Sequence, residues 1–304
     1  LSEVARIQGE METIKAAVGF DGPLTAFFQH IKTGEQFHYP NTAEGKQAFL
    51  DEAKRLIAQV MADAPRYFHR LPRAPLDVRA VEAFRENTAR VAFYNRPSAD
   101  GSRPGIFYVN LKDMGQVLKP QIEAMAYHEG APGHHFQLAR SIEQPGLPMF
   151  RKFGFYGAYI EGWGLYAERL GKEMGYYTDP YSDFGRLSLE LWRAVRLVVD
   201  TGLHAKRWTR EQAIAYFQSN SLLSELDIVR EVERYISSPG QATSYKIGQL
   251  KILALRAKAQ AALGARFDIR DFHEVVLGNG GLPLGELERQ VDEWVAVGGG
   301  MPAA

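Results

Sequence analysis

Residues 126–137 read AYHEGAPGHHFQ and hold three of the eight histidines of this 304-residue chain. His128 is followed at once by Glu129, while His134 and His135 come after a Pro-Gly pair. The helix of a zinc hydrolase typically reads His-Glu-x-x-His, because residues four apart share a helix face and can grip one ion, with the glutamate as base. The residue types here predict such a metal site, although the second histidine comes two or three positions late.

The Pro-Gly pair explains the irregular spacing but leaves the second ligand open. In an undistorted helix His128 and His135 would nearly eclipse, since they are seven residues apart, and His134 would point away. Pro132 cannot continue the helix without a kink or a bulge. A bulge of two residues would bring His134 to the ligand position instead. Spacing alone does not decide between the two histidines.

A second stretch, YGAYIEGWGLYAERL at 156–170, offers a third ligand. Glu161 stands in an apolar and aromatic helical run, where an unpaired carboxylate would be costly to bury. A glutamate on a following helix completes a zinc site of two histidines and one glutamate. Gly162 and Gly164 weaken a helix unless another group must approach closely. Glu168, two turns further on the same face, could orient a ligand histidine or be a solvated surface carboxylate.

Other polar residues carry weaker signals. Asp200 and His204 are four apart on one helical face, so they could form a second metal site, brace the first, or be structural polarity. Tyr245 and Lys246 follow a turn, and either side chain could stabilise an oxyanion near zinc. The alternative for Tyr245 is a half-buried aromatic at a helix start. Arg256 could bind a substrate carboxylate or lie on a solvated helix face.

Helical periodicity dominates the elements that must position these residues, so the predicted fold is mainly α with a small β element. SRPGIFYVNL, at 102–111, is the best strand, and the segment 74–84 is a short strand or a turn of helix. Helical pattern, with breaks, covers about 120–256. No repeat or linker marks a boundary, which predicts one α-rich catalytic domain over 1–304, or the catalytic half of a longer protein, with a frayed tail at 298–304.

Composition excludes several classes of protein. Lys plus Arg equals Asp plus Glu at 36 each, so no basic excess indicates nucleic-acid binding. There is no cysteine, so any metal must be held by histidine and carboxylate. No run of 18 apolar residues predicts a membrane span. The chain starts without Met, in helical rhythm and without a signal-peptide pattern, as a piece of a longer protein would, so no compartment is predicted.

Four stretches in order, HEGAPGHHFQ, EGWGLYAERL, VDTGLHAKRWTREQAIAYF and PGQATSYKIGQL, resemble the signatures of a bacterial family known as domain of unknown function 885. The resemblance runs from about residue 20 to the GNGGLPLGELE of the tail. Members are usually longer, which implies that this chain is the C-terminal half and that a missing N-terminal half packs against it.

The family is similar to the gluzincin metallopeptidases. This resemblance implies a helix-rich, zincin-like metallopeptidase fold with one Zn²⁺ per chain, held by two histidines and a glutamate. The family shares Pro-Gly-His, with the next position less constant, which favours His134 over His135 as the second histidine ligand.

Together these features predict a zinc-dependent hydrolase, foremost a metallopeptidase acting on a peptide or small amide. Zinc would polarise the scissile carbonyl and activate water, and Glu129 would take the proton and pass it to the leaving amine. The strand 105–111 could pair with an extended peptide, as an edge strand does in similar metallopeptidases. The alternatives are a metal-dependent hydrolase of a non-peptide amide or ester, and a non-catalytic binding module. Glu129 argues against the module, since a structural metal site needs no base.

Overall fold

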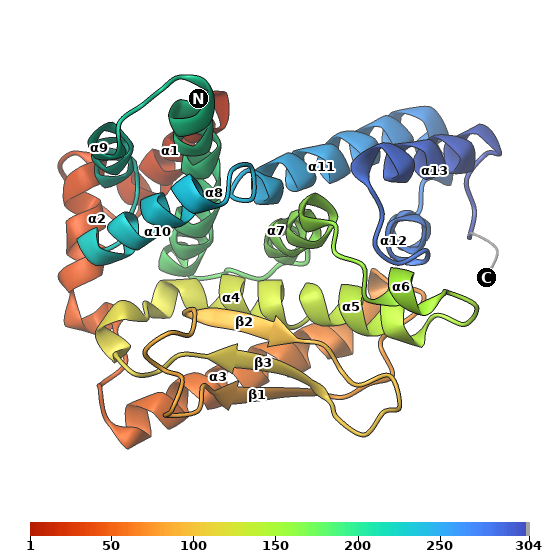
Figure 1. Ribbon diagram of the computed structural model, residues 1–304, viewed down its shortest axis with the longest axis horizontal. Coiled ribbons are helices and arrows are strands. Elements are labelled where there is room, and N and C mark those ends of the chain that lie inside the picture. Colours follow the sequence, from red (N-terminus) through yellow and green to blue (C-terminus); the bar gives the residue numbers. More distant parts are fainter. Residues whose placement is uncertain (302–304) are drawn as a thin grey trace. The chain divides into compact units, whose positions relative to one another are not determined.

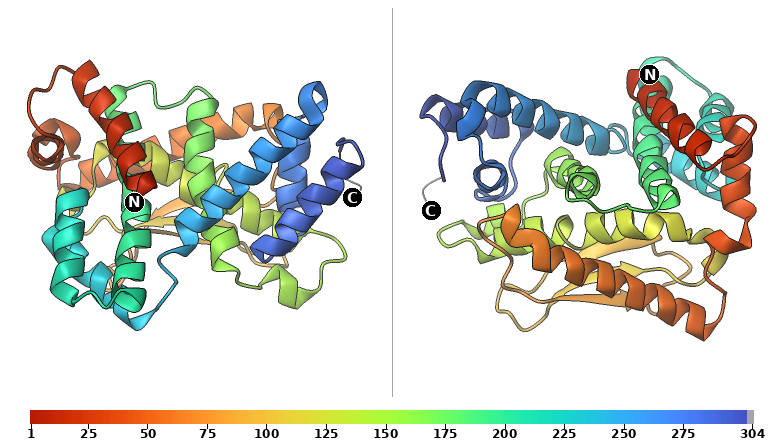
Figure 2. Two further views of the ribbon diagram at one scale, coloured as in Figure 1. Left: turned by 90° about the horizontal axis from the view of Figure 1, so that it is seen from above. Right: turned by 180° about the vertical axis from the view of Figure 1, so that it is seen from behind.

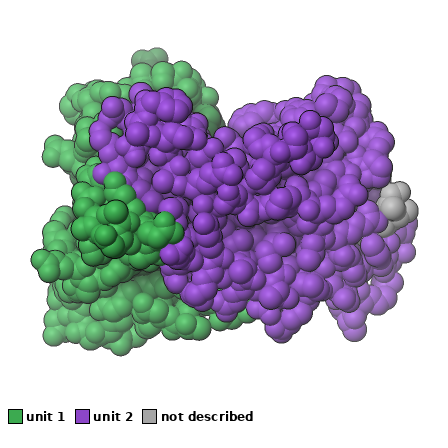
Figure 3. Space-filling view, turned by 90° about the horizontal axis from the view of Figure 1, so that it is seen from below, with its two compact units in different colours: residues 1–49, 113–124, 169–246 green, residues 50–112, 125–168, 247–304 purple. Residues whose placement is uncertain are grey.

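The structure, a computed structural model, describes residues 1–301 (Figure 1). It is mainly helical with a small sheet, which confirms the predicted mainly α fold with a small β element. Its contacts divide the chain into two compact units (Figure 3). Because each unit combines three separate segments, the division could not show as a linker in the sequence. Unit 1 comprises 1–49, 113–124 and 169–246, and unit 2 comprises 50–112, 125–168 and 247–304.

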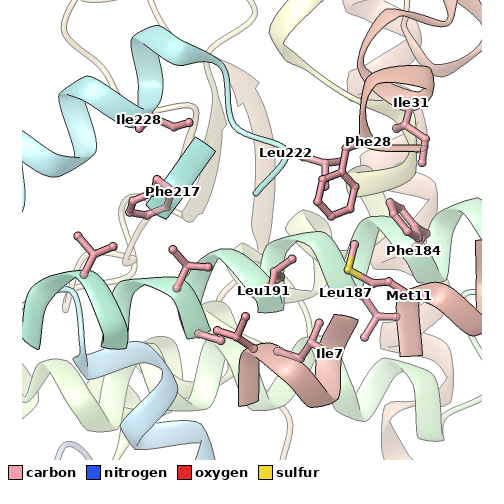
Figure 4. Packing of buried hydrophobic residues seen from close by; sticks show 14 of the residues in the cluster. Ile7, Met11, Phe28, Ile31, Phe184, Leu187, Leu191, Phe217, Leu222 and Ile228 are labelled. Atoms are coloured by element: carbon pink, nitrogen blue, oxygen red, sulfur yellow. The ribbon is translucent and has the colours of Figure 1, made fainter. Parts of the chain in front are cut away.

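Unit 1 is built from helices packed around one apolar core. Ile7 and Met11 of the first helix lie among Leu187 and Leu191 of the long eighth helix (Figure 4). Side-chain caps begin the later helices; Asp179, for example, accepts from the backbone N–H of Tyr181. The helices are α1 (Ser2–Ala17), α2 (Leu24–Thr33), α8 (Pro180–Ala205), α9 (Arg210–Asn220) and α10 (Glu225–Ser237).

Unit 2 contains a three-stranded sheet in the order β1-β3-β2. The strand predicted at 102–111 is β3 (Gly105–Val109), and the segment 74–84 contains β1 (Leu76–Ala80). β1 runs parallel to β3, and β2 (Ala92–Asn95) runs antiparallel to it. The expectation that 105–111 could accept an extended peptide is wrong, because β3 is hydrogen-bonded on both sides and only β1 and β2 have a free edge.

A helix covers one face of the sheet of unit 2. The part of α3 (Ala43–Asp63) that belongs to this unit crosses one face of the sheet (Figures 1 and 2). α11 (Ser244–Leu263) lies along α13 (Leu284–Ala296), tied to it by two ion pairs, Lys251 with Glu288 and Lys258 with Asp292 (Figure 2). The remaining helices are α4 (Ile122–Glu129), α5 (His134–Glu143), α6 (Met149–Lys152), α7 (Gly157–Glu173) and α12 (Ile269–Leu277).

α7 crosses α5 at a steep angle and packs closely against α11 (Figures 1 and 2). Gln137 donates to the Tyr159 carbonyl over 3.1 Å, which ties α5 to the first turn of α7. Gly162 meets Gly248 of α11 so closely that a β-carbon at position 162 would lie 2.5 Å from backbone atoms of Gly248. The close approach expected at Gly162 is therefore present, and it explains a glycine in the middle of a helix.

The C-terminal residues pack back onto unit 2 as far as the structure describes them. Trp294 donates its indole N–H to the Gly300 carbonyl over 2.7 Å, and Arg266 donates to the Gly298 carbonyl over 3.1 Å. The tail expected to fray at 298–304 is thus held at its start, and 302–304 lie outside the described residues. Among the helices of residues 1–301, none has the length and apolar character needed to cross a bilayer.

Candidate metal centre

The break between α4 and α5 has a defined geometry. α4 ends at Glu129 and α5 begins at His134. The peptide bond before Pro132 is cis, and Trp163 donates its indole N–H to the Pro132 carbonyl over 2.9 Å. A β-carbon at Gly133 would overlap a backbone carbonyl of α4, so only glycine fits there. The break therefore places His134 at the first position of α5, facing back toward α4.

Three buried side chains converge at this break. His128 Nε2 lies 3.5 Å from Glu161 Oε2, and His134 Nε2 lies 3.4 Å from the same oxygen. The two imidazole rings are nearly perpendicular, with centroids 4.7 Å apart. One nitrogen from each histidine and one carboxylate oxygen all lie within 4.8 Å of one another. We call His128, His134 and Glu161 the His-His-Glu group.

Glu168 accepts a hydrogen bond from the ring of His128, on the side of the ring away from Glu161. Its Oε1 lies 2.7 Å from His128 Nδ1, and because a carboxylate oxygen accepts, Nδ1 carries the proton and donates it. Nε2 then faces Glu161, where it can donate a proton to the carboxylate or, once that proton is lost, offer its lone pair to an ion. The structure thus places Glu168 where the sequence suggested an orienting partner. The ring of His134 lacks such a partner, since its Nδ1 makes no hydrogen bond within residues 1–301.

The electrostatics of the His-His-Glu group show strong mutual attraction. Burial disfavours the charged form of His128, but its hydrogen bonds to Glu161 and Glu168 outweigh burial and raise its pKa to about 9. Burial likewise opposes ionisation of Glu161, but hydrogen bonds from His128 and His134 hold the pKa of its carboxyl well below the usual range. Glu161 is therefore a buried carboxylate stabilised by two imidazoles, and a cation could take over that role.

His135 lies outside the His-His-Glu group. Its Nε2 is 3.1 Å from the Ala74 carbonyl, which can only accept, so Nε2 must donate. Its Nδ1 is 2.9 Å from the Tyr94 hydroxyl, which then donates. Burial lowers the pKa of His135 to about 4, which keeps this ring neutral. Both ring nitrogens are used, so His135 ties α5 to β2 and to Ala74, two residues before β1.

Glu129, the predicted base, has a free carboxylate. It is partly exposed at the end of α4, and it makes no hydrogen bond or ion pair within the described residues. Its negative charge helps to raise the pKa of His128, which shows that it lies near the His-His-Glu group. A carboxylate that is close to the group and free of partners is available to take a proton.

Asp200 and His204 bind backbone groups of unit 1. Asp200 accepts from the Gly240 N–H over 3.0 Å, and His204 Nε2 lies 2.9 Å from the Tyr235 carbonyl. These contacts support the structural interpretation of both residues. They belong to none of the metal-type groups found within residues 1–301.

Tyr245 and Lys246, the predicted oxyanion partners, also belong to unit 1. Lys246 is fully buried, with its ammonium 2.6 Å from Glu190 and 2.8 Å from Glu3. The Tyr245 ring packs on the guanidinium of Arg196 at 4.5 Å. Lys246, at the start of α11, thus pairs with one carboxylate on α1 and one on α8.

Arg256, the predicted partner of a substrate carboxylate, lies in unit 2. It donates to the Tyr166 hydroxyl over 3.2 Å, and that hydroxyl lies 2.8 Å from His273 Nε2. Burial lowers the pKa of His273 to about 3, so the ring stays neutral in this buried network. Sequence reasoning missed Tyr166 and His273, because neither stands in a recognisable spacing.

A second group of side chains that could hold a metal comes from the segment before β1 and from the start of α12 with its N-cap residue. His69, Asp268 and Asp271 bring ligand atoms within 4.8 Å of one another. His69 already lies 2.7 Å from Asp271, and Asp268 caps α12 and forms an ion pair with Arg270. These contacts explain why the three side chains lie close together, and no ion is needed to hold them there.

Gly164 leaves room for the ring of His128, as the sequence suggested for a glycine inside a helix. A β-carbon at this position would lie 2.7 Å from two atoms of that ring. We expect Gly164→Ala to displace His128, to lower the melting temperature and to weaken metal binding by about 10–100-fold, the usual effect of disturbing the support of a ligand. Isothermal titration and thermal melting measure both effects.

Gly9→Ala is the matched control, because Gly9 also lies within a helix and a β-carbon there would meet nothing within 4 Å. It should stabilise the protein by roughly 0.5–1 kcal/mol. If Gly164→Ala behaved in the same way, His128 would not depend on that space.

The fold and the site define a mainly helical protein with a buried His-His-Glu group beside a free glutamate. The chain belongs to the family described as bacterial protein of unknown function (DUF885), whose model matches residues 1–291. No curated protein matches it in sequence.

Two solved structures are similar to this chain. A "putative lipoprotein" from Colwellia psychrerythraea is 43% identical with a TM-score of 0.95, covering 98% of this chain and 51% of that one. A "putative lipoprotein of unknown function" from Shewanella oneidensis is 24% identical with a TM-score of 0.79, covering 95% of this chain and 54% of that one; it shows the fold alone. The chain thus spans about half the length of these two proteins.

Proposed function

We propose that this protein is a zinc-dependent hydrolase, foremost a metallopeptidase with a gluzincin-like site. The observation that carries the proposal is the His-His-Glu group, whose three ligand atoms lie within 4.8 Å of one another. Two histidines and a glutamate that leave a position open are the ligand set of catalytic zinc. Calcium and magnesium prefer oxygen ligands, so the two imidazoles favour a transition metal.

The residues around the group fit this role. Zinc held there would supply Lewis-acid chemistry at neutral pH. Glu168 fixes His128 with Nε2 toward Glu161, so His128, His134 and Glu161 would hold the zinc together. Glu129 would accept a proton from water and return it to the leaving amine, because its carboxylate is free and close to the group.

An extended peptide would have to use an edge of the sheet other than β3. β2 has a free edge and is tied to α5 by the hydrogen bond between Tyr94 and His135. We therefore propose that an extended peptide pairs with the free edge of β2, the strand that is bonded to His135.

The first expected result concerns the metal. The purified protein should carry about one zinc per chain, because three ligands, one of them a histidine oriented by Glu168, bind zinc tightly. Elemental analysis after dialysis measures the content, and His128→Ala should reduce it. Absence of any transition metal, even after incubation with zinc, would remove the basis of the proposal. A panel of peptides, simple amides and esters then separates a peptidase from the two alternatives.

A further inference from the structure

An eight-residue segment of unit 2 exposes an unusual run of large apolar side chains. The segment 149–156, MFRKFGFY, comprises α6 and the loop that leads into α7; we call it the aromatic ledge. Contiguous exposed apolar surface of this kind indicates a binding site. The exposed fractions are 58% for Met149, 77% for Phe150, 44% for Phe153, 68% for Phe155 and 40% for Tyr156.

Positive charge accompanies the aromatic ledge. Arg151 and Lys152 belong to it, and Arg96, just after β2, holds its guanidinium over the Phe153 ring at 5.7 Å. All three cations donate to backbone carbonyls, and none forms an ion pair with a carboxylate within residues 1–301. The ledge therefore suits a ligand that combines an apolar side chain with a negative charge.

The aromatic ledge is connected to the His-His-Glu group in two ways. Tyr156 leads directly into α7, where Glu161 follows roughly 7.5 Å along the helix axis at 1.5 Å per residue. Arg96 comes two residues after Tyr94, which bonds to His135 next to the group. An extended peptide advances about 3.4 Å per residue, so the separation of Tyr156 from Glu161 along α7 corresponds to two or three peptide residues.

We propose that the aromatic ledge and Arg96 form a substrate subsite for peptides that carry a large apolar side chain two or three residues from the cleaved bond and a carboxylate beside it. The apolar side chain would cover the exposed phenylalanines, and the carboxylate would pair with the cations. This inference rests on the proposed peptidase function for its reaction, but its binding step can be tested separately.

The test compares two surface variants of the zinc-loaded protein. Phe150→Ser combined with Phe155→Ser removes the most exposed rings of the aromatic ledge, and Phe84→Ser removes a ring that is 86% exposed elsewhere in unit 2. The probe is a fluorescein-labelled octapeptide with Phe and Leu near a free C-terminus, compared with its all-Ser analogue and its C-terminal amide. The Kd follows from fluorescence polarisation, and kcat and KM from unlabelled peptide.

The ledge variant should weaken binding of the apolar peptide about tenfold, the scale of a lost apolar contact, and raise KM with kcat nearly unchanged. Phe84→Ser should change neither. Arg151→Gln should reduce the preference for the free carboxylate over the amide.

Equal Kd values in wild type and ledge variant would overturn the subsite, even if peptides are cleaved. Ledge-dependent binding without cleavage would leave the subsite standing and would contradict the proposed peptidase function.

Discussion

Glu129→Gln is expected to lower turnover by about 10²–10⁴-fold, the contribution typical of an essential proton-transfer group, while zinc content stays unchanged. Glutamine keeps the shape of the side chain but cannot take a proton. The carboxylate of Glu129 makes no bond to the His-His-Glu group, so its replacement should leave metal binding intact. Elemental analysis and initial rates on a cleaved peptide measure the two quantities.

Glu293→Gln serves as the control, because Glu293 is an exposed glutamate on α13 of the same unit and should matter to neither quantity. Loss of zinc in Glu129→Gln would make Glu129 a ligand. Unchanged turnover would mean that Glu129 is not the base and that another group accepts the proton.

The second large effect is expected from the two neighbouring histidines. His134→Ala should reduce zinc affinity by more than about 100-fold, because it removes a ligand and not merely an outer support. His135→Ala should keep zinc, since both of its ring nitrogens are engaged by Tyr94 and Ala74. It should instead lower the free energy of unfolding by about 1–3 kcal/mol, because those two partners lose their hydrogen bonds.

Zinc titration and denaturant unfolding of both variants separate these roles. His134→Ala should lose mainly zinc affinity and His135→Ala mainly stability, so each variant is the control for the other. Equal and mild losses of zinc affinity from both would contradict the assignment of His134, and a ligand would then have to be sought outside the His-His-Glu group.

The sequence alone determined the fold class, the strand at β3 and the chemical types at the site. His128 and Glu129 could be singled out because they match the start of a His-Glu-x-x-His helix. Glu161 could be singled out because it stands in an apolar helical run, where a buried carboxylate needs partners. Helical period also placed Glu168 on the face of Glu161, since two turns return a side chain to one face, but it left open whether Glu168 orients a histidine or lies in solvent. Gly162 and Gly164 were identifiable because glycine weakens a helix unless space is needed. Each of these signals depends only on residues close together in the chain, so a single sequence is enough to detect it.

Only the tertiary structure shows that His134, and not His135, lies in the His-His-Glu group. The direction of the chain after the break depends on Trp163, which binds the Pro132 carbonyl from another helix, and on Tyr94, which engages His135 from the sheet. The central position of β3 and the division into two units likewise depend on contacts between segments far apart in the chain. Periodicity reports which face of an element is buried, but the partner that buries it is chosen by packing across the whole chain, which local spacing does not encode.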